Sequence, residues 1–343
     1  MIKKYIKKYW PVLAFSLLIN IPIVIMGTIR TNKDITLKGD TQNINDMIKV
    51  DTEYEEKGSF SSIYVIDFEH STILQNLICS NIKTADVSDL NENYNNLSDL
   101  ERFKVGQIQK ESSIAKSIIL VYSELMKYEV PDINIEYKYK GIEVTYYSKK
   151  SSLRIGDRII KINDISIDEG RNNFQDALHN HLFDDKLDSY TILRDNKEII
   201  FTEEDIDYNN FYAYDMYDIN YETISPKISI KSNLVGGPSG GLMQALSIFN
   251  KLYKEYDLTK GYKVSGTGTI DLEGNVGKIG GIKQKIYTAF EDNVDIFFCP
   301  KDNYEDALEA YNTLKNKEKM ALVPVSHYSD AIYLLGYIND KEV

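Results

Sequence analysis

The longest apolar stretch of the chain lies near its N-terminus, where residues 10–29 include no charged side chain. A stretch of this length is about what a helix needs to cross the hydrocarbon core of a bilayer. Four lysines precede it, and by the positive-inside rule they place the N-terminus in the cytoplasm. We therefore predict that residues 1–30 form cytoplasmic lysines and a transmembrane anchor. A cleaved signal peptide is the alternative, although the apolar run is long for one and no A-x-A-like site follows it.

Beyond the anchor, the period of the apolar residues changes from segment to segment. Residues 31–57 are polar with little periodicity, so we interpret them as a spacer. Residues 58–128 open with a strand-like run, Ser59–Phe68, and end with helical spacing over 97–125. We predict that this segment supplies a strand and helices to a domain that is completed later in the chain.

The C-terminal part, residues 206–343, alternates short strand-like and helix-like runs. Lys227–Lys231 alternates polar and apolar residues at the two-residue period of a half-buried strand. The other predicted strands lie at 294–299 and 320–325, and the predicted helices lie at 242–252, 304–314 and 328–335. With the earlier strand and helices, this pattern predicts an α+β core that is long enough to bury itself.

Composition limits the class of partner. The formal net charge is −12, and five of the 40 basic residues lie in residues 1–30. Because no long basic stripe remains, we expect no nucleic-acid partner. The two cysteines are too few for a disulfide scaffold, and Cys299 ends an apolar run typical of a buried strand, which favours a free thiol. The four histidines show no zinc-protease spacing, so we expect no metal.

A glycine-rich segment, GGPSGGL at Gly236–Leu242, lies between the predicted strand at 227–231 and the predicted helix that follows. Glycines at the start of a helix leave backbone N–H groups accessible, and an oxyanion or a phosphate can be held there. Ser239 is then either a nucleophile in acyl transfer or part of a phosphoryl cradle. A strand-to-helix turn with Ser239 as the N-cap is the third interpretation. The chain has no G-x-x-x-x-G-K-[ST] loop, which argues against phosphoryl transfer.

The segment Thr267–Lys285, TGTIDLEGNVGKIGGIKQK, favours the first interpretation. Together the two segments resemble the proteolytic domain of Lon-type serine proteases, whose marks are a G-P-S-x-G loop and a T-G-x-x-x-x-x-G-x-V-x-x-I-G-G-x-x-x-K segment. The run KESSIAKS, which begins at Lys110, is similar to a K-E-S-x-x-A-x-x helix of the same domains. The resemblance implies the following site residues: the nucleophile Ser239, its base Lys285, the supporting Thr267, and the oxyanion loop residues Gly237, Pro238 and Gly240.

The chemistry of a serine nucleophile is compatible with a lysine base. A serine hydroxyl must pass its proton to a base within hydrogen-bond reach, and the histidines lie in no triad-like motif. A free lysine has a pKa of about 10.4. Burial against Ile282 and Ile286 would lower the pKa of Lys285 toward neutrality. Lys283 lies two residues earlier, so we expect its side chain to leave the Lys285 face and to be solvated.

A second resemblance lies ahead of the glycine-rich segment. Gly141–Ile167 contains the pattern L-x-x-G-D-x-I-x-x-I-N, and it is similar to the most recognisable segment of PDZ domains. A helix and a strand pair with a turn at Asp195-Asn196 follow. We predict a PDZ-like domain at 129–205, and the predicted groove residues are Gly141, Ile142 and Leu178. The G-L-G-F carboxylate loop is missing, so a β-rich domain that only positions its neighbour is the alternative.

Taken whole, the chain resembles the membrane-anchored PDZ-Lon serine proteases of bacteria, a group that includes pheromone-processing peptidases. The resemblance implies a Lon-type proteolytic domain at 206–343, with the PDZ-like module inserted in it or preceding it. It implies an ATP-independent serine endopeptidase without a cofactor. Its catalytic domain would be extracellular, held to the cell membrane through residues 10–29, and would cleave exported peptides or unfolded proteins. Homo-oligomers, commonly hexamers in this family, are also implied. A catalytically inactive membrane-anchored PDZ scaffold is the alternative.

Overall fold

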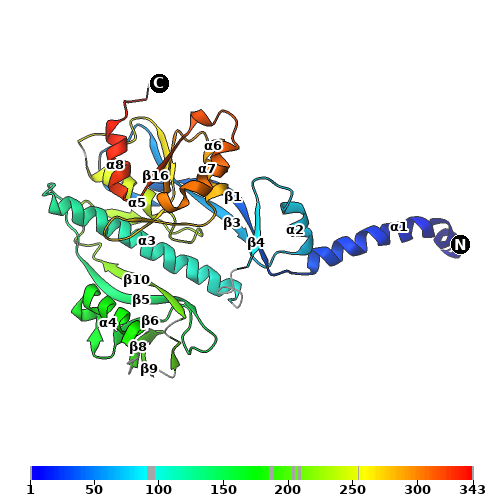
Figure 1. Cartoon of the computed structure of the whole chain (residues 1–343), viewed down its shortest axis with the longest axis horizontal. Helices are drawn as coiled ribbons and strands as arrows, with labels where there is room; N and C mark the ends of the chain where they lie inside the picture. The colour runs from blue at the N-terminus through cyan, green and yellow to red at the C-terminus, as the bar shows by residue number, and fades with distance from the viewer. Residues whose placement is uncertain are drawn as a thin grey trace.

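The computed structural model describes residues 2–90, 97–184, 189–202, 205–207, 210–253 and 255–341. Helix α1 (Ile2–Thr28) projects away from two bodies that lie on either side of the long helix α3 (Asp99–Lys127) (Figure 1). We call the larger body, residues 33–127 and 220–341, the main domain, and the smaller one, residues 137–219, the inserted module.

Helix α1 is the candidate membrane span that the apolar run predicts. It contains one segment, Lys7–Thr28, that is long and apolar enough to cross a membrane, and none of the window that passes this test is buried inside the structure. Apolar side chains that contact no protein favour another apolar environment. By length and composition, α1 therefore suits a lipid environment.

A six-stranded mixed sheet forms the centre of the main domain, in the order β16-β15-β12-β3-β1-β4. Its strands are β1 (Lys33–Asn43), β3 (Ser59–Phe68), β4 (Asp86–Asp89), β12 (Lys263–Gly266), β15 (Ile296–Pro300) and β16 (Ala321–Val325). Neighbours from β3 to β16 are parallel, whereas β1 is antiparallel to both β3 and β4. The predicted strands at 59–68, 294–299 and 320–325 are thus confirmed within two residues at each end.

Helices cover both faces of this sheet. The helices are α3, α5 (Gly241–Leu252), α6 (Ile282–Glu291), α7 (Tyr304–Asn312) and α8 (Tyr328–Tyr337). Successive residues of a strand point to opposite faces. Accordingly Ile296 and Phe298 pack in one core with α3, α5 and α8, while Phe297 and Cys299 pack in another with α6 and α7. Cys299 is a buried free thiol, as predicted.

The main domain is therefore a mixed α/β fold, not the α+β fold that we expected. Parallel strands require long crossover connections, and α6 and α7 supply them between β12, β15 and β16. Two small ladders complete the domain. They are β2 (Ile48–Val50) with β11 (Ile228–Ile230), and the hairpin of β13 (Thr269–Ile270) with β14 (Val276–Gly277).

Residues 31–57, which we expected to form a spacer, are instead part of the main domain. β1 lies between β3 and β4, so its backbone is paired on both sides. Only Ile35 of β1 is fully buried, which explains why the strand lacks an apolar signal. The hydrophobic pattern could not reveal it because backbone pairing, not side-chain burial, holds it in place.

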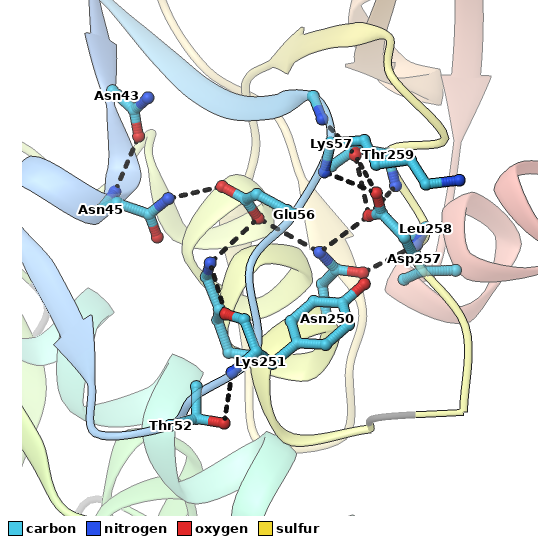
Figure 2. A network of polar contacts seen from close by, with 12 residues as sticks. Asn43, Asn45, Thr52, Glu56, Lys57, Asn250, Lys251, Asp257, Leu258 and Thr259 are labelled. Carbon is cyan, nitrogen blue, oxygen red and sulfur yellow. Dashed lines mark hydrogen bonds and ion pairs between the residues drawn. The ribbon is translucent and has the colours of Figure 1, made fainter. Parts of the chain in front are cut away.

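A polar network fixes the segment between β2 and β3 (Figure 2). The buried carboxylate of Glu56 accepts hydrogen bonds from Asn45 and from Asn250 near the end of α5. The amide of Lys57 donates to Asp257 at 2.8 Å. A buried carboxylate is tolerated when donors surround it, so this segment is anchored to α5.

The inserted module is an antiparallel sheet in the order β10-β5-β6-β8-β9, with β7 beside β6. Its elements are β5 (Tyr137–Tyr147), β6 (Arg158–Ile162), β7 (Ile165–Ser166), α4 (Arg171–Asp184), β8 (Ser189–Arg194), β9 (Lys197–Thr202) and β10 (Phe211–Ile219). A further helix, α2 (Ile73–Cys79), lies in the main domain between β3 and β4. Positive φ angles at Asp195 and Asn196 close the β8–β9 hairpin at the predicted turn.

The module extends further than the predicted boundary at 205. β10 pairs along the whole of β5, from Phe211 opposite Tyr147 to Ile219 opposite Tyr137. The sequence pattern does not show that β10 belongs to the module, because its partner β5 lies about 70 residues earlier in the chain. The main domain is continued on both sides of the module, so the module is an insertion. Its resemblance to a PDZ domain stays a prediction.

Candidate active site

The loop that carries Ser239 runs from residue 233 to 240, between β11 and α5, and we call it the nucleophile loop. Lys110 of α3 holds its first part. The Lys110 ammonium donates to the carbonyl oxygens of Asn233 and Val235, at 2.8 and 3.0 Å. Burial lowers the pKa of Lys110, but these contacts favour its charged form. Lys110 therefore acts as a clamp on the loop backbone.

Two serines further along the same face of α3 hold the rest of the loop. Ser113 Oγ donates to the carbonyl of Pro238 at 3.1 Å, and Ser117 Oγ donates to the carbonyl of Gly241 at 3.1 Å. Residues spaced by three and four lie on one helix face, so Lys110, Ser113 and Ser117 form a polar stripe. The K-E-S motif includes Lys110, but we did not predict that these three residues contact the nucleophile loop and the start of α5. The signal of the stripe was three polar residues at helical spacing, two of which, Ser113 and Ser117, are buried in the structure.

Ser239, Thr267 and Lys285 meet behind the nucleophile loop. The amine of Lys285 lies 2.8 Å from Ser239 Oγ and 2.9 Å from Thr267 Oγ1. Thr267 Oγ1 also donates to the carbonyl of Ser239 at 3.0 Å. Ser239 and Lys285 are 46 residues apart in the sequence, yet their side chains lie within hydrogen-bond distance. The N-cap of α5 is Gly240, without a side-chain cap, so Ser239 is not the capping residue of a simple turn.

Lys285 is one of the largest fully buried side chains in the described part of the chain. It lies in the first turn of α6, between the buried residues Ile282 and Ile286. Burial penalises an ammonium ion and lowers the pKa of Lys285 to about 7, while the carboxylate of Asp67 acts in the opposite direction. A substantial fraction of this amine is therefore neutral near physiological pH.

Lys283 differs from Lys285, as its position on the helix predicts. Its side chain is 42% exposed and pairs with Glu309 of α7 at 2.6 Å. The hydrogen bond to Glu309 raises the pKa of Lys283. Lys283 is therefore a charged, solvated residue, and it serves as a natural control for Lys285.

The backbone amides of the nucleophile loop are not equally available to an oxyanion. The amide of Gly237 donates to the carbonyl of Gly106 on α3 at 2.8 Å, and Pro238 has no amide hydrogen. Neither residue can therefore donate a backbone hydrogen bond to an oxyanion, as the prediction requires. Among the described hydrogen bonds, the amides of Ser239 and Gly240 donate to no protein acceptor. These two amides are the remaining candidate donors.

A cleft of about 700 Å³ opens in front of Ser239. Its lining includes Thr36 and Gln42 of β1, residues 62–67 of β3, the nucleophile loop, Gly280, Gly281 and Lys285. β12 pairs with β3 only at Ser59–Ser62. Within the described chain, the side of β3 from Ile63 to Asp67 that is not paired with β1 therefore borders the cleft as an open strand edge.

His327, the histidine closest in sequence to the catalytic motifs, serves a structural purpose. Its side chain caps the N-terminus of α8. One ring nitrogen is 2.7 Å from Ser329 Oγ, and the other is 2.7 Å from the carbonyl of Glu273. Both nitrogens are thus engaged away from Ser239.

Two of the three predicted groove residues of the module, Ile142 and Leu178, line one cleft, and Gly141 does not. Gly141 lies within β5, where an added Cβ would be 2.2 Å from the Ile159 carbonyl, so it belongs to a strand contact and not to a carboxylate loop. Ile142 is buried, and β10 pairs with β5 beside it. Ile142 and Leu178 both line one cleft of about 370 Å³, together with Lys116, Gln175 and residues 211–215. This cleft is therefore bordered by β5 and α4, as predicted, and also by β10.

A carboxylate joins the module to the main domain beside this cleft. Asp215 of β10 is buried and accepts a hydrogen bond from Gln175 of α4 at 2.6 Å. Arg171 of α4 lies 3.2 Å from Asp215 and 3.6 Å from Glu273 in the turn between β13 and β14. This ion-pair chain thus links α4 of the module to the β13–β14 turn of the main domain.

Residues 225–335 match the family model of the Lon protease (S16) C-terminal proteolytic domain. This part of the chain therefore resembles the proteolytic domain of Lon-type serine peptidases. The match contains Ser239, Thr267 and Lys285, but it reaches neither the inserted module nor α1.

Lon proteases of several bacteria are similar to this chain. The chain is 35% identical over 94 residues to the Lon protease of Aster yellows witches'-broom phytoplasma, which covers 27% of this chain and 11% of the relative. It is 28% identical over 121 residues to that of Mycoplasmopsis agalactiae, covering 35% and 12%. It is 31% identical over 123 residues to that of Clostridioides difficile, covering 34% and 15%. The matched part thus spans only about a tenth to a seventh of these relatives.

Proposed function

We propose that this protein is an ATP-independent serine endopeptidase in which Ser239 is the nucleophile and Lys285 is the general base. The observation that carries the proposal is the 2.8 Å contact between the buried Lys285 amine and Ser239 Oγ. A catalytic base needs both hydrogen-bond reach and a pKa near the working pH, and burial gives Lys285 a pKa of about 7. The sequence contains no G-x-x-x-x-G-K-[ST] nucleotide loop, which supports ATP independence.

In the first step, Ser239 Oγ attacks the scissile carbonyl carbon and the neutral Lys285 amine takes the hydroxyl proton. The carbonyl electrons move to oxygen, and the amides of Ser239 and Gly240 donate to that oxyanion. When the C–N bond breaks, Lys285 returns its proton to the leaving amine. Water then hydrolyses the acyl-enzyme with Lys285 again as the base. Thr267 keeps the amine oriented, because its Oγ1 is 2.9 Å from Lys285 Nζ.

The substrate is a peptide or an unfolded protein segment. The open edge of β3 from Ile63 to Asp67 offers backbone groups beside the cleft, and an extended peptide can pair with such an edge. Pairing would align a scissile bond with Ser239 whatever the side chains are. A folded substrate would first have to expose an extended segment that can pair with β3. Flexible segments are therefore favoured as substrates.

We also propose that α1 anchors the enzyme with its N-terminus in the cytoplasm, so that the site acts on exported substrates. This rests on the apolar segment Lys7–Thr28 and the lysines near its start. The inserted module would select substrates through the cleft beside β10. Assembly into a ring is proposed from the family resemblance alone.

The experiment that tests the proposal compares three variants in cleavage of a flexible peptide. Ser239→Ala and Lys285→Arg should each lower kcat/KM by about 10³-fold or more, because an arginine cannot be deprotonated in a protein. Lys283→Arg, on the same helix, is the matched control and should retain activity. Thermal unfolding verifies that each variant is folded. Appreciable cleavage by folded Lys285→Arg would show that another group is the base, and inactivity of the wild type on all exported peptides would favour the scaffold alternative.

A further inference from the structure

Helix α2 (Ile73–Cys79) is an unusual element of the main domain because none of its residues is fully buried. A capping box at Thr72 and Gln75 begins the helix, so its formation does not depend on a core. Leu77 and Ile78 are each 55% exposed, and Ile82 just after the helix is 43% exposed. Leu77 and Ile78 thus expose more than half of their surface where no described part of the chain covers them.

The apolar side of α2 is continuous with the end of α1. Leu74, Leu77 and Ile78 are spaced by three and four residues, so they lie on one face of the helix. On that face, Leu74 lies close to the last turn of α1, since an added Cβ at Gly27 would be 3.8 Å from its side chain. The amide of Ile73 also donates to the carbonyl of Ile29 at 3.1 Å. Figure 1 shows α2 beside the C-terminal end of α1, at the junction with the main domain.

We propose that α2 lies in the outer interface of the bilayer, with Leu77, Ile78 and Ile82 in contact with lipid. The inference rests on the proposed function only in that α1 must span the membrane. If it does, the last turn of α1 marks the bilayer surface, and the face of α2 that contacts this turn meets the same surface. A short helix with an apolar face can lie in this plane. A lipid surface is therefore the occupant that the contact with α1 favours over a protein partner.

This placement limits the distance between the membrane surface and one end of the candidate site's cleft. β3 ends at Phe68 and α2 is capped by Thr72, so Asp67 at the cleft is five residues from α2. Five extended residues span at most about 18 Å. The end of the cleft at Asp67 thus lies within that distance of the cap of α2. Exported chains that are still attached to the membrane would reach the cleft at a high effective concentration.

The test uses the full chain in vesicles of phosphatidylglycerol and phosphatidylcholine. A fluorescent NBD group is attached to Ile78→Cys in a Cys79→Ser background, where the remaining Cys299 is buried and unreactive. We expect shallow doxyl lipids to quench this label and aqueous iodide to leave it bright. Tyr337→Cys on α8, 74% exposed in the native side chain, is the control that iodide should quench.

Quenching of the label at position 78 by iodide, to the extent seen at position 337, would overturn the inference. So would protection from both quenchers, because that result means a protein surface covers α2. Flotation of the wild type with the vesicles after a carbonate wash tests α1 separately, so a failed anchor is distinguished from an exposed α2. These readouts do not depend on peptidase activity.

A functional readout uses the variant with Leu77→Gln, Ile78→Gln and Ile82→Gln, which changes exposed positions only. We expect it to cleave a lipid-tethered peptide roughly 10-fold more slowly than the wild type, and to cleave the same peptide without the lipid at the wild-type rate. Equal rates on the tethered peptide would contradict the proposal.

Discussion

Gly106 of α3 and Gly236 of the nucleophile loop lie back to back, so that a Cβ added to Gly236 would be 2.9 Å from the Gly106 Cα atom. The neighbouring amide of Gly237 donates to the Gly106 carbonyl at 2.8 Å. Only backbone separates helix and loop at this point, because glycine has no side chain to hold them apart. The position of Ser239 is therefore set from α3, more than 100 residues earlier in the chain.

Gly236→Ala should lower kcat by about 10²-fold without unfolding the protein. The added methyl group pushes the loop from α3, and a displacement of about 1 Å at a reacting group can cost that much. Gly336→Ala on α8 is the matched control, because an added Cβ there meets only the Tyr256 hydroxyl, at 3.9 Å. Steady-state kinetics on one peptide measures both variants. Wild-type kcat in Gly236→Ala would show that the glycine contact does not position Ser239.

The rate should depend on pH through Lys285. Because the amine must be neutral to accept a proton, kcat/KM should rise with pH to a plateau, with a midpoint near the Lys285 pKa of about 7. The Asp67 carboxylate favours the ammonium form, so Asp67→Asn should move the midpoint to lower pH. An uncharged peptide substrate keeps other titrations out of the profile. A midpoint that stays fixed or rises in Asp67→Asn would contradict this role for Asp67.

Lys285→Met should stabilise the fold, and more so at pH 6 than at pH 9. The pKa of Lys285 is about 7 in the folded protein and about 10.4 in an unfolded chain. Between these values the unfolded chain binds more protons, so the stability of the wild type rises with pH. The gain from Lys285→Met should be about 2–3 kcal/mol larger at pH 6 than at pH 9.

Urea unfolding at the two pH values measures this difference. Lys283→Met is the control, because the exposed Lys283 pairs with Glu309 in solvent and should show a much smaller dependence. A gain in Lys285→Met that is equal at both pH values would mean that the folded pKa is not lowered.

Leu178→Gln should change substrate choice rather than chemistry. Leu178 is partly buried and lines the cleft beside β10, while Ser239, Thr267 and Lys285 belong to the main domain. We expect slower cleavage of a long exported substrate and unchanged cleavage of a short peptide. Asn172→Gln, at an exposed position of α4, is the control. Equal loss on both substrates would indicate that the module is structural.

The sequence was most informative where function constrains a local motif. Ser239 and Lys285 lie in long motifs with fixed spacing, and the structure brings them within 2.8 Å. Their catalytic role stays a prediction. Helix geometry alone predicted that Lys283, unlike Lys285, is solvated. Its exposed ion pair with Glu309 agrees with this prediction.

The sequence was least informative where the partner of a segment is remote. β1 is mostly polar, and only its Ile35 is fully buried, because backbone pairing with two neighbouring strands holds the strand in place. β10 needs β5 to be recognisable, and their pairing set both the module boundary and the burial of Ile142. The sequence makes Gly237 a candidate oxyanion donor, but in the structure its amide donates to the carbonyl of Gly106. Long-range pairing of this kind leaves no periodic trace in one chain.

The chain enters and leaves the inserted module at a single point, since Tyr137 pairs with Ile219 and the amide of Asn220 donates to the carbonyl of Glu136 at 2.8 Å. For the main domain, the module is therefore a loop whose two ends are already joined. During descent, such a unit can be lost or exchanged for another without altering the order or the register of any strand in the central sheet. Related chains with the same peptidase domain are accordingly expected to differ most at this junction, with different modules or a short turn between α3 and β11.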